Sequence, residues 1–148
     1  MSLGRCLILG GSGFIGSHLA ELLVAEDFEV RILSRSAGSS SRLVAVAARV
    51  ELLEGDYRDT QRLANAIRGC DYVYHLIATT VPAISNRDVV SDTDTNLIPT
   101  LRLLENLRSG ERTTDCLLLF WRHSVWEDRK SADCGDSLDR TTIFLWDR

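Results

Sequence analysis

Three glycines spaced three residues apart, Gly10, Gly13 and Gly16, constrain the fold of this chain more than any other feature. They follow a short apolar run at residues 5–9 that has no helical period, and a segment with helical spacing begins directly after them. Glycine lets the chain turn sharply at Gly10, leaves backbone N–H groups accessible at Gly13, and lets a helix lie against the strand at Gly16. Because a helix N-terminus attracts anions, the pattern predicts a strand, a phosphate-binding turn and a helix.

The helix after this turn carries apolar residues at helical spacing. These residues are Phe14, Ile15, Leu19, Leu22 and Leu23. An amphipathic helix packs its apolar side on the rest of the protein, so we expect these side chains to form one buried face.

Predicted strands and helices alternate through the first 110 residues. Further strands are expected at residues 29–34, 50–53 and 72–77, and further helices at 59–68 and 95–108. The expected inner face of the last helix consists of Leu97, Leu101, Leu104 and Leu107. Such alternation is typical of an α/β fold with a doubly wound parallel sheet. The loops after the first four strands are therefore expected to line one site at the carboxyl ends of the strands.

Composition excludes some classes of function. With 148 residues, 45% of them hydrophobic and 26% charged, the chain suits a single soluble globular domain. The net charge of −4 gives no electrostatic reason to expect nucleic acid as a partner. No apolar run is long enough to span a membrane, so a cytoplasmic location is expected. The cysteines show no Cys-x-x-Cys spacing and are interpreted as reduced thiols that form no metal site: Cys6, Cys70, Cys116 and Cys134.

Residues 10–19 read Gly-Gly-Ser-Gly-Phe-Ile-Gly-Ser-His-Leu, and this wording resembles the NAD-dependent epimerase/dehydratase family, the extended branch of the short-chain dehydrogenases/reductases. Within that family the chain resembles the nucleotide-sugar 4-epimerases. The resemblance implies a Rossmann-type NAD(P)-binding domain in residues 1–110, with NAD or NADP as the cofactor. It also implies a nucleotide-sugar substrate, and it makes the helix at 95–108 the candidate face for a homodimer.

The resemblance assigns cofactor-binding roles to residues in all four loops. The pyrophosphate would be cradled by Gly10, Gly13, Phe14, Ile15 and Gly16. The other assigned residues are Arg35 on the adenosine ribose, Asp56 and Tyr57 on the adenine, Leu76, Ala78 and Thr79 near the nicotinamide ribose, and Asn96 at the start of the next helix. None of these residues performs the chemistry, and no metal site is expected.

Some of these residues also have simpler structural interpretations. Asp56 suits a turn or a helix N-cap, and Asn96 suits a cap of the helix that it opens. His75 is interpreted as a core histidine and not as a base. Arg35 occupies the position at which the residue type distinguishes NAD-binding from NADP-binding members of the family. Its guanidinium can clasp an adenosine 2′-phosphate, which favours NADP, although it can also stack on adenine.

The catalytic residues of the family are missing from this chain. Relatives continue with a strand that ends in Ser or Thr and then a Tyr-x-x-x-Lys pair, in which the tyrosine moves the proton and the lysine lowers its pKa. This chain has a single lysine, Lys130, preceded four positions earlier by Trp126, and its tyrosines are Tyr57, Tyr72 and Tyr74. No catalytic residue is assigned, and the chain alone is expected to show no turnover.

Residues 111–148 form an atypical tail that holds all three tryptophans. Codons for residues 119–127, read one nucleotide later, permit Ser-Ser-Gly-Gly-Thr-Val-Tyr-Gly, the family's active-site strand and loop. Codons for residues 143–148 followed by a TAA stop permit Phe-Ser-Tyr-Gly-Ile-Val-Lys, which contains the Tyr-x-x-x-Lys pair. We interpret the tail as the result of a nucleotide gained or lost near Gly110, with a genuinely divergent tail as the alternative.

This interpretation predicts a truncated Rossmann fold. Residues 116–120 are still apolar and can serve as a fifth strand, while residues 122–140 are expected to be loose. The leading functional hypothesis is the NAD(P)-binding part of an epimerase/dehydratase. The alternatives are a non-catalytic dinucleotide sensor or partner-binding module, and an NADP-dependent reductase of the same superfamily with a different substrate.

Overall fold

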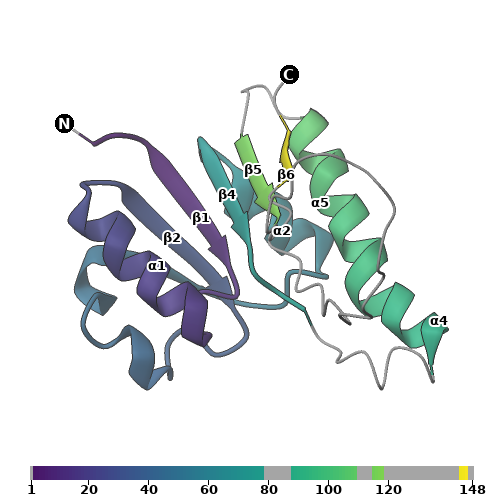
Figure 1. The fold of residues 1–148 in the computed structure, drawn as a ribbon, viewed down its shortest axis with the longest axis horizontal. Coiled ribbons are helices and arrows are strands. Elements are labelled where there is room, and N and C mark those ends of the chain that lie inside the picture. Colours follow the sequence, from purple (N-terminus) through teal and green to yellow (C-terminus); the bar gives the residue numbers. More distant parts are fainter. Residues whose placement is uncertain (1, 79–87, 110–114, 119–143, 147–148) are drawn as a thin grey trace, which may run out of the picture.

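The computed structural model describes residues 2–78, 88–109, 115–118 and 144–146, and a six-stranded sheet lies at its centre (Figure 1). The strand order is β3-β2-β1-β4-β5-β6, and every neighbouring pair is parallel except β5 and β6. The bounds are β1 Arg5–Leu9, β2 Glu29–Ser34, β3 Val50–Glu54, β4 Tyr72–His75, β5 Asp115–Leu118 and β6 Phe144–Trp146. The order of the parallel strands is that of a doubly wound sheet, which confirms the predicted fold class.

Helices cover both faces of the sheet (Figure 1). The helical elements are α1 Phe14–Ala25, the short 3₁₀ turns η1 Ser41–Leu43 and η2 Ala47–Arg49, α2 Thr60–Ile67, α4 Val89–Asp92, the π-helical turn η3 Thr93–Leu97, and α5 Ile98–Ser109. The core on the α1 face consists of Cys6, Ile8, Ala20, Leu23, Val24, Val30, Ile32, Leu43 and Val46. The core under α2 and α5 includes Leu7, Leu9, Leu33, Tyr57, Leu63, Ala66, Val73, Leu103 and Leu107. Strand β1 contributes to both cores, as a central parallel strand that is covered on both faces must.

Helix α1 buries a face that differs in part from the one predicted. Phe14, Ile15 and Leu22 are 71%, 49% and 58% exposed, so the predicted apolar face is wrong at these three positions, whereas Leu23 is buried and Leu19 packs against the core, as predicted. The buried residues of the helix are Gly16, Ser17, Ala20, Leu23 and Val24. The reason is steric: a Cβ on Gly16 would lie 2.6 Å from the carbonyl oxygen of Gly10, so the bare side of Gly16 must face the turn. That contact sets the rotation of the whole helix about its axis.

The last helix also differs from the prediction in its start and its inner face. It forms one helical path from Val89 onward through η3, and Leu97 and Leu101 are 52% and 46% exposed. The buried residues are Pro99, Thr100, Leu103 and Leu107. Leu107 is buried and Leu104 packs against the core, as predicted, so the expected inner face is wrong only at Leu97 and Leu101. Leu97 is the last residue of the π-helical turn η3, which has more residues per turn than an α-helix and so changes the phase between Leu97 and the residues of α5.

Backbone hydrogen bonds continue past the ends of the central strands and hold the following loops at one level. The three bonds run from Gly10 N to Leu33 O (3.1 Å), from Gly55 N to Ser34 O (3.0 Å) and from Leu76 N to Leu9 O (3.1 Å). The loops after β1, β2, β3 and β4 therefore begin side by side at the carboxyl edge of the sheet. In doubly wound folds this edge is where ligands bind.

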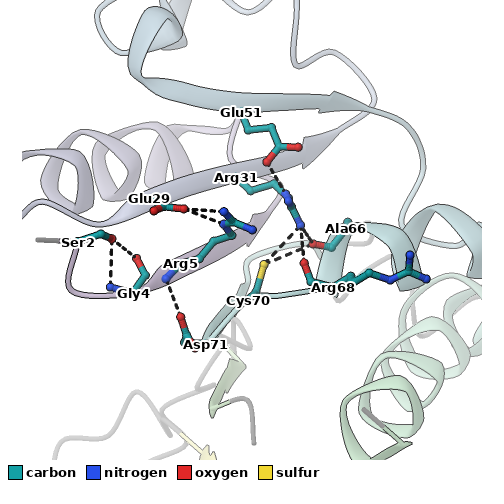
Figure 2. Close-up of polar contacts among 10 residues, drawn as sticks. All are labelled: Ser2, Gly4, Arg5, Glu29, Arg31, Glu51, Ala66, Arg68, Cys70 and Asp71. Carbon is teal, nitrogen blue, oxygen red and sulfur yellow. Dashed lines mark hydrogen bonds and ion pairs between the residues drawn. The ribbon is translucent and has the colours of Figure 1, made fainter. Parts of the chain in front are cut away.

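A buried arginine on strand β2 connects the sheet to the C-terminal end of helix α2 (Figure 2). Arg31 of β2 is 9% exposed, and its Nε donates to Glu51 at 2.7 Å. Its Nη1 donates to the carbonyl oxygens of Ala66 at 2.6 Å and Arg68 at 3.0 Å, and lies 3.7 Å from the Cys70 sulfur. These carbonyls lie at the C-terminal end of α2, where helices leave acceptors unpaired. Arg31 thus supplies the donors that the end of α2 lacks.

The remaining predictions on the chain are tested only in part. Cys6 and Cys70 are buried free thiols, as predicted. A strand, β5, lies where a fifth strand was predicted at 116–120, with bounds Asp115–Leu118. The loose segment predicted at 122–140, and Cys134 within it, lie outside the described residues.

Candidate functional site

The glycine turn leaves an open cradle at the end of β1. Gly10 has φ of +84°, and a Cβ there would lie 2.9 Å from Ile77 Cγ1. A Cβ on Gly16 would lie 2.6 Å from both Gly10 O and Gly11 Cα. A Cβ on Gly13, in contrast, would meet only Gly10 O, at 3.3 Å. The structure therefore requires glycine at Gly10 and Gly16 for packing, while Gly13 is less crowded, because a Cβ there would meet a single backbone oxygen.

The first turn of α1 is an anion-binding arrangement that no side chain fills. Gly13 is the N-cap residue of α1. It has no side chain that could accept a capping hydrogen bond, and the first turn of the helix contains no acidic residue. The N–H groups of Phe14, Ile15 and Gly16 lie in this turn, where helices leave donors without intrahelical acceptors. A helix of this length also presents the positive end of its dipole here. Backbone donors, the dipole and the absence of a capping side chain together fit a pyrophosphate.

Hydroxyl groups and one cation gather at the end of β2. The Ser12 hydroxyl is within hydrogen-bond distance of Ser34 Oγ, and it lies 3.4 Å from Ser36 Oγ. Arg35 between these serines is exposed, and its charge contributes to lowering the pKa of Asp56 in the next loop. The loops after β2 and β3 therefore approach one another on this side of the glycine turn, at the predicted adenosine end of the site.

Asp56 is a turn residue with an ionised side chain. It accepts hydrogen bonds from the backbone N–H of Arg58 at 2.9 Å and from the guanidinium of the same residue, and that pairing is the main reason why its pKa is lowered. The N-cap of α2 is a different residue, Asp59, which accepts from Gln61 N and Arg62 N. Of the two structural roles considered for Asp56, the structure contains the turn and excludes the cap of α2.

Tyr57 and His75 point into the core and not toward the cradle. Tyr57 is 4% exposed, and its hydroxyl donates to the carbonyl oxygen of Thr95 at 2.8 Å. His75 is 3% exposed, and burial lowers its pKa to about 4, which agrees with its interpretation as a core histidine. Leu76 is half-buried and Ala78 is exposed at the end of β4, while Thr79 lies outside the described residues. The predicted contact of the Tyr57 ring with adenine remains a prediction.

Asn96 lies inside the π-helical turn η3 and not at a helix start. Its Nδ2 donates to Asp92 Oδ1 at 2.7 Å, and the N-cap of α4 is Asp88, whose side chain accepts from Ser91 N. The alternative role of Asn96 as a simple helix cap is therefore wrong, because the helical path begins about two turns earlier, at Val89. Sequence reasoning missed Asp88, although an aspartate just before the pair Val89-Val90 is a usual start signal.

The described residues contain no group of three or more His, Cys, Asp or Glu side chains that could hold a metal ion. Within the same ranges, no helix has both the length and the apolar character needed to cross a membrane.

Comparison with known proteins identifies the fold and motif. Residues 7–121 match the family model described as GDP-mannose 4,6 dehydratase. The chain belongs to this epimerase/dehydratase family. The match begins in β1 and extends through the glycine turn and all four loops, so the family resemblance seen in residues 10–19 is confirmed across the whole site.

Proteins with different names are similar to this chain. The chain is 39% identical over 82 residues to the fatty acid hydroxylase uhd1 of Mycosarcoma maydis, covering 53% of this chain and 27% of that protein. It is 31% identical over 108 residues to dTDP-glucose 4,6-dehydratase of Mycolicibacterium smegmatis, covering 70% and 33%. UDP-glucose 4-epimerase from Brucella ovis, solved in complex with NAD, has a TM-score of 0.66 and 28% identity, covering 78% and 35%. The chain thus spans only the smaller part of each relative.

Proposed function

We propose that this chain is the NAD(P)-binding part of an epimerase/dehydratase that acts on a nucleotide sugar. The observation that carries the proposal is the uncapped first turn of α1 beside the bare side of Gly13, because it offers backbone donors to an anion and little else. A bound dinucleotide would supply the hydride-transfer chemistry for such a reaction. The residues of this chain bind and orient the cofactor and supply no proton-transfer group.

Each loop has a defined part in that binding. The N–H groups of Phe14, Ile15 and Gly16 would donate to the pyrophosphate. The carboxylate of Asp56 would accept from the exocyclic amine of adenine, and its lowered pKa keeps it ionised as an acceptor. The segment after β4, which begins at Leu76, would lie along the nicotinamide ribose.

The end of β2 favours NADP over NAD. NAD-specific sites place an acidic side chain there to bind the ribose 2′-hydroxyl, whereas an arginine accommodates a 2′-phosphate. This chain has Arg35 flanked by Ser34 and Ser36, with the Ser12 hydroxyl beside both serines. A guanidinium among hydroxyl donors suits a dianionic phosphate. This observation also supports the second candidate function, an NADP-dependent reductase with a substrate other than a nucleotide sugar.

The test is a titration of the purified chain with NADH and NADPH, followed by thermal unfolding. A ligand that binds only the folded state at 100 times its Kd adds about 2.7 kcal/mol to the free energy of unfolding. We expect stabilisation by both cofactors, larger for NADPH, and an Arg35→Ser variant should lose the preference. No stabilisation by either cofactor would refute the proposed function.

We propose further that the chemistry of the parent enzyme is encoded in a second frame. Read one nucleotide later, codons for Asp115, Cys116 and Leu117 permit Ile-Val-Phe, and the Leu118 codon supplies one further residue before the Ser-Ser-Gly-Gly-Thr-Val-Tyr-Gly described above. An apolar strand therefore precedes this motif in either frame. The hypothesis requires particular codons, among them CTC for Leu119, AGT for Ser124 and GTA for Val125.

The nucleotide sequence decides this point. If it contains these codons, deleting one nucleotide near codon 110 should give a protein with cofactor-linked turnover. A TCN codon at Ser124 would exclude valine at that place in the shifted frame, and it would favour a genuinely divergent tail.

A further inference from the structure

The π-helical turn η3 is linked to two buried side chains, one from the loop after β3 and one from the end of strand β4. Tyr57, from the loop after β3, donates through its hydroxyl to Thr95 O at 2.8 Å. A π-helical turn displaces backbone carbonyls from the regular helical pattern, and such turns are frequent at functional sites. The Tyr57 side chain is buried, so its hydroxyl brings a hydrogen-bond donor to Thr95 O from inside the protein.

His75 is the second anchor. Its Nε2 lies 3.2 Å from Thr100 Oγ1, and the Thr100 hydroxyl donates to Asn96 O at 2.6 Å. Because that hydroxyl has one hydrogen, it accepts from His75, which fixes the proton on Nε2. Nδ1 is then free to accept from Ile77 N–H at 3.4 Å. One chain of hydrogen bonds therefore links the loop after β4 to the carbonyl of Asn96.

The two anchors also contact each other and the glycine turn. The rings of Tyr57 and His75 lie 5.3 Å apart with a tilt of 48°. Ile77, which His75 holds, fills the space beside Gly10 that a Cβ would need. The network thus joins the turn for the pyrophosphate, the start of the segment after β4, and the turn that contains Asn96. Asp56, at the adenosine side, is bound to Arg58 and takes no part in it.

We propose that Tyr57 and His75 are positioning residues for the nicotinamide half of the cofactor. They hold η3, and Asn96 within it, in a fixed place beside the segment after β4, so that this half of the site is formed before the ligand arrives. The adenosine half depends on Arg35 and on Asp56, whose side chain is bound to Arg58, and it does not require the hydrogen bonds of Tyr57 and His75. The inference rests on the proposed dinucleotide binding and adds a division of the site into two independently held halves.

The test compares whole cofactors with their adenosine halves by calorimetric titration of the full chain. The ligand pairs are NADH with adenosine diphosphate and NADPH with adenosine 2′,5′-bisphosphate. Tyr57→Phe removes one hydroxyl, His75→Leu removes both hydrogen-bonding ring atoms, and His75→Gln restores a donor and an acceptor. Tyr74→Phe is the matched control, since Tyr74 packs in the core on the α1 face.

We expect Tyr57→Phe and His75→Leu to weaken binding of the whole cofactor about five- to tenfold, as allosteric couplings of this kind do. Affinity for the adenosine halves should stay unchanged, and His75→Gln should recover most of the loss. Tyr74→Phe should match the original chain. Titrations well below each variant's unfolding temperature separate binding from stability, and Tyr57→Phe decides the matter if His75→Leu does not fold.

Two outcomes would count against the inference in different ways. Equal losses for the whole cofactors and their halves, or no loss in Tyr57→Phe, would overturn it and leave the proposed function intact. An unsubstituted chain that binds neither a cofactor nor its half would refute the proposed function and the inference together.

Discussion

Substitution of glycine by alanine is expected to affect cofactor binding at Gly13 and the stability of the fold at Gly16. Gly13→Ala adds a methyl group where the only neighbour is Gly10 O at 3.3 Å, and Gly13 has φ of −76° and ψ of 177°, which alanine adopts freely. Alanine also restricts the unfolded chain, which stabilises by about 0.4–1 kcal/mol, against a small loss as an N-cap residue. We therefore expect the free energy of unfolding to change by less than about 0.5 kcal/mol.

Gly16→Ala is expected to lower the free energy of unfolding. Its methyl group would lie 2.6 Å from Gly10 O and from Gly11 Cα, and both are backbone atoms that cannot rotate away. Overpacking of this kind costs about 1–3 kcal/mol, and the better helix propensity of alanine returns about 1 kcal/mol. Since the contacts are to backbone, we take the upper end and expect a net loss of about 2 kcal/mol.

The two variants should be compared by urea unfolding and by calorimetric titration with NADPH. Gly13→Ala should keep the stability of the original chain and lose at least about tenfold in affinity, equivalent to 1.4 kcal/mol, because its methyl group occupies the place of the pyrophosphate. Gly16→Ala should unfold at lower urea. Full affinity in Gly13→Ala would refute the position of the pyrophosphate, and full stability in Gly16→Ala would refute the close contact between α1 and the turn.

Three further predictions concern other parts of the fold. Arg31→Met should reduce the free energy of unfolding in urea by about 2–4 kcal/mol, because the carbonyls of Ala66 and Arg68 lose the guanidinium as a hydrogen-bond donor. Glu51→Gln changes a half-exposed partner and should cost less than about 1 kcal/mol, and equal costs for the two variants would contradict this. Burial lowers the pKa of His75 to about 4 in the folded state, so the unfolded state takes up a proton at higher pH than the folded state does. The free energy of unfolding should therefore fall by up to about 1.4 kcal/mol per pH unit as the pH drops from about 6.5 to about 4. The same pH series on His75→Gln should lack this slope, and an unchanged slope would assign it to other groups. Cys6, whose pKa burial raises to about 12, should resist alkylation at pH 8 until the chain unfolds, as peptide mapping by mass spectrometry can measure.

The glycine turn and the strand order were predictable because both depend on the backbone. A Gly-x-x-Gly-x-x-Gly spacing reports where no side chain fits, and alternating elements admit few topologies. The inner faces of α1 and α5 were not predictable by counting apolar residues. In α1, Phe14 and Ile15 are apolar yet lie exposed at the mouth of the candidate site, so their apolar character points to ligand contact and not to the core.

The network around η3 could not have been found from sequence. A π-helical turn has no reliable sequence signature, and the bonds from Tyr57 to Thr95 and from His75 to Thr100 join residues that are distant in the chain. Sequence reasoning placed Tyr57 on the adenine because it follows Asp56 directly, and a buried hydroxyl partner was invisible at that stage. Arg31 was missed for the same reason, since its partners belong to a different element.

The arrangement separates cofactor binding from chemistry along the chain. The four loops at the carboxyl edge, the helix that donates to the anion and the turn that contains Asn96 all come from residues before 110. The two cores that hold these loops are likewise built from β1 to β4 and from α1, α2 and α5. A change of reading frame after α5 would therefore remove the proton-transfer residues while leaving the hydrogen bonds of the binding half in place. On the proposed function, this division would let a chain keep the backbone groups that bind a dinucleotide while the residues for proton transfer lie outside its reading frame.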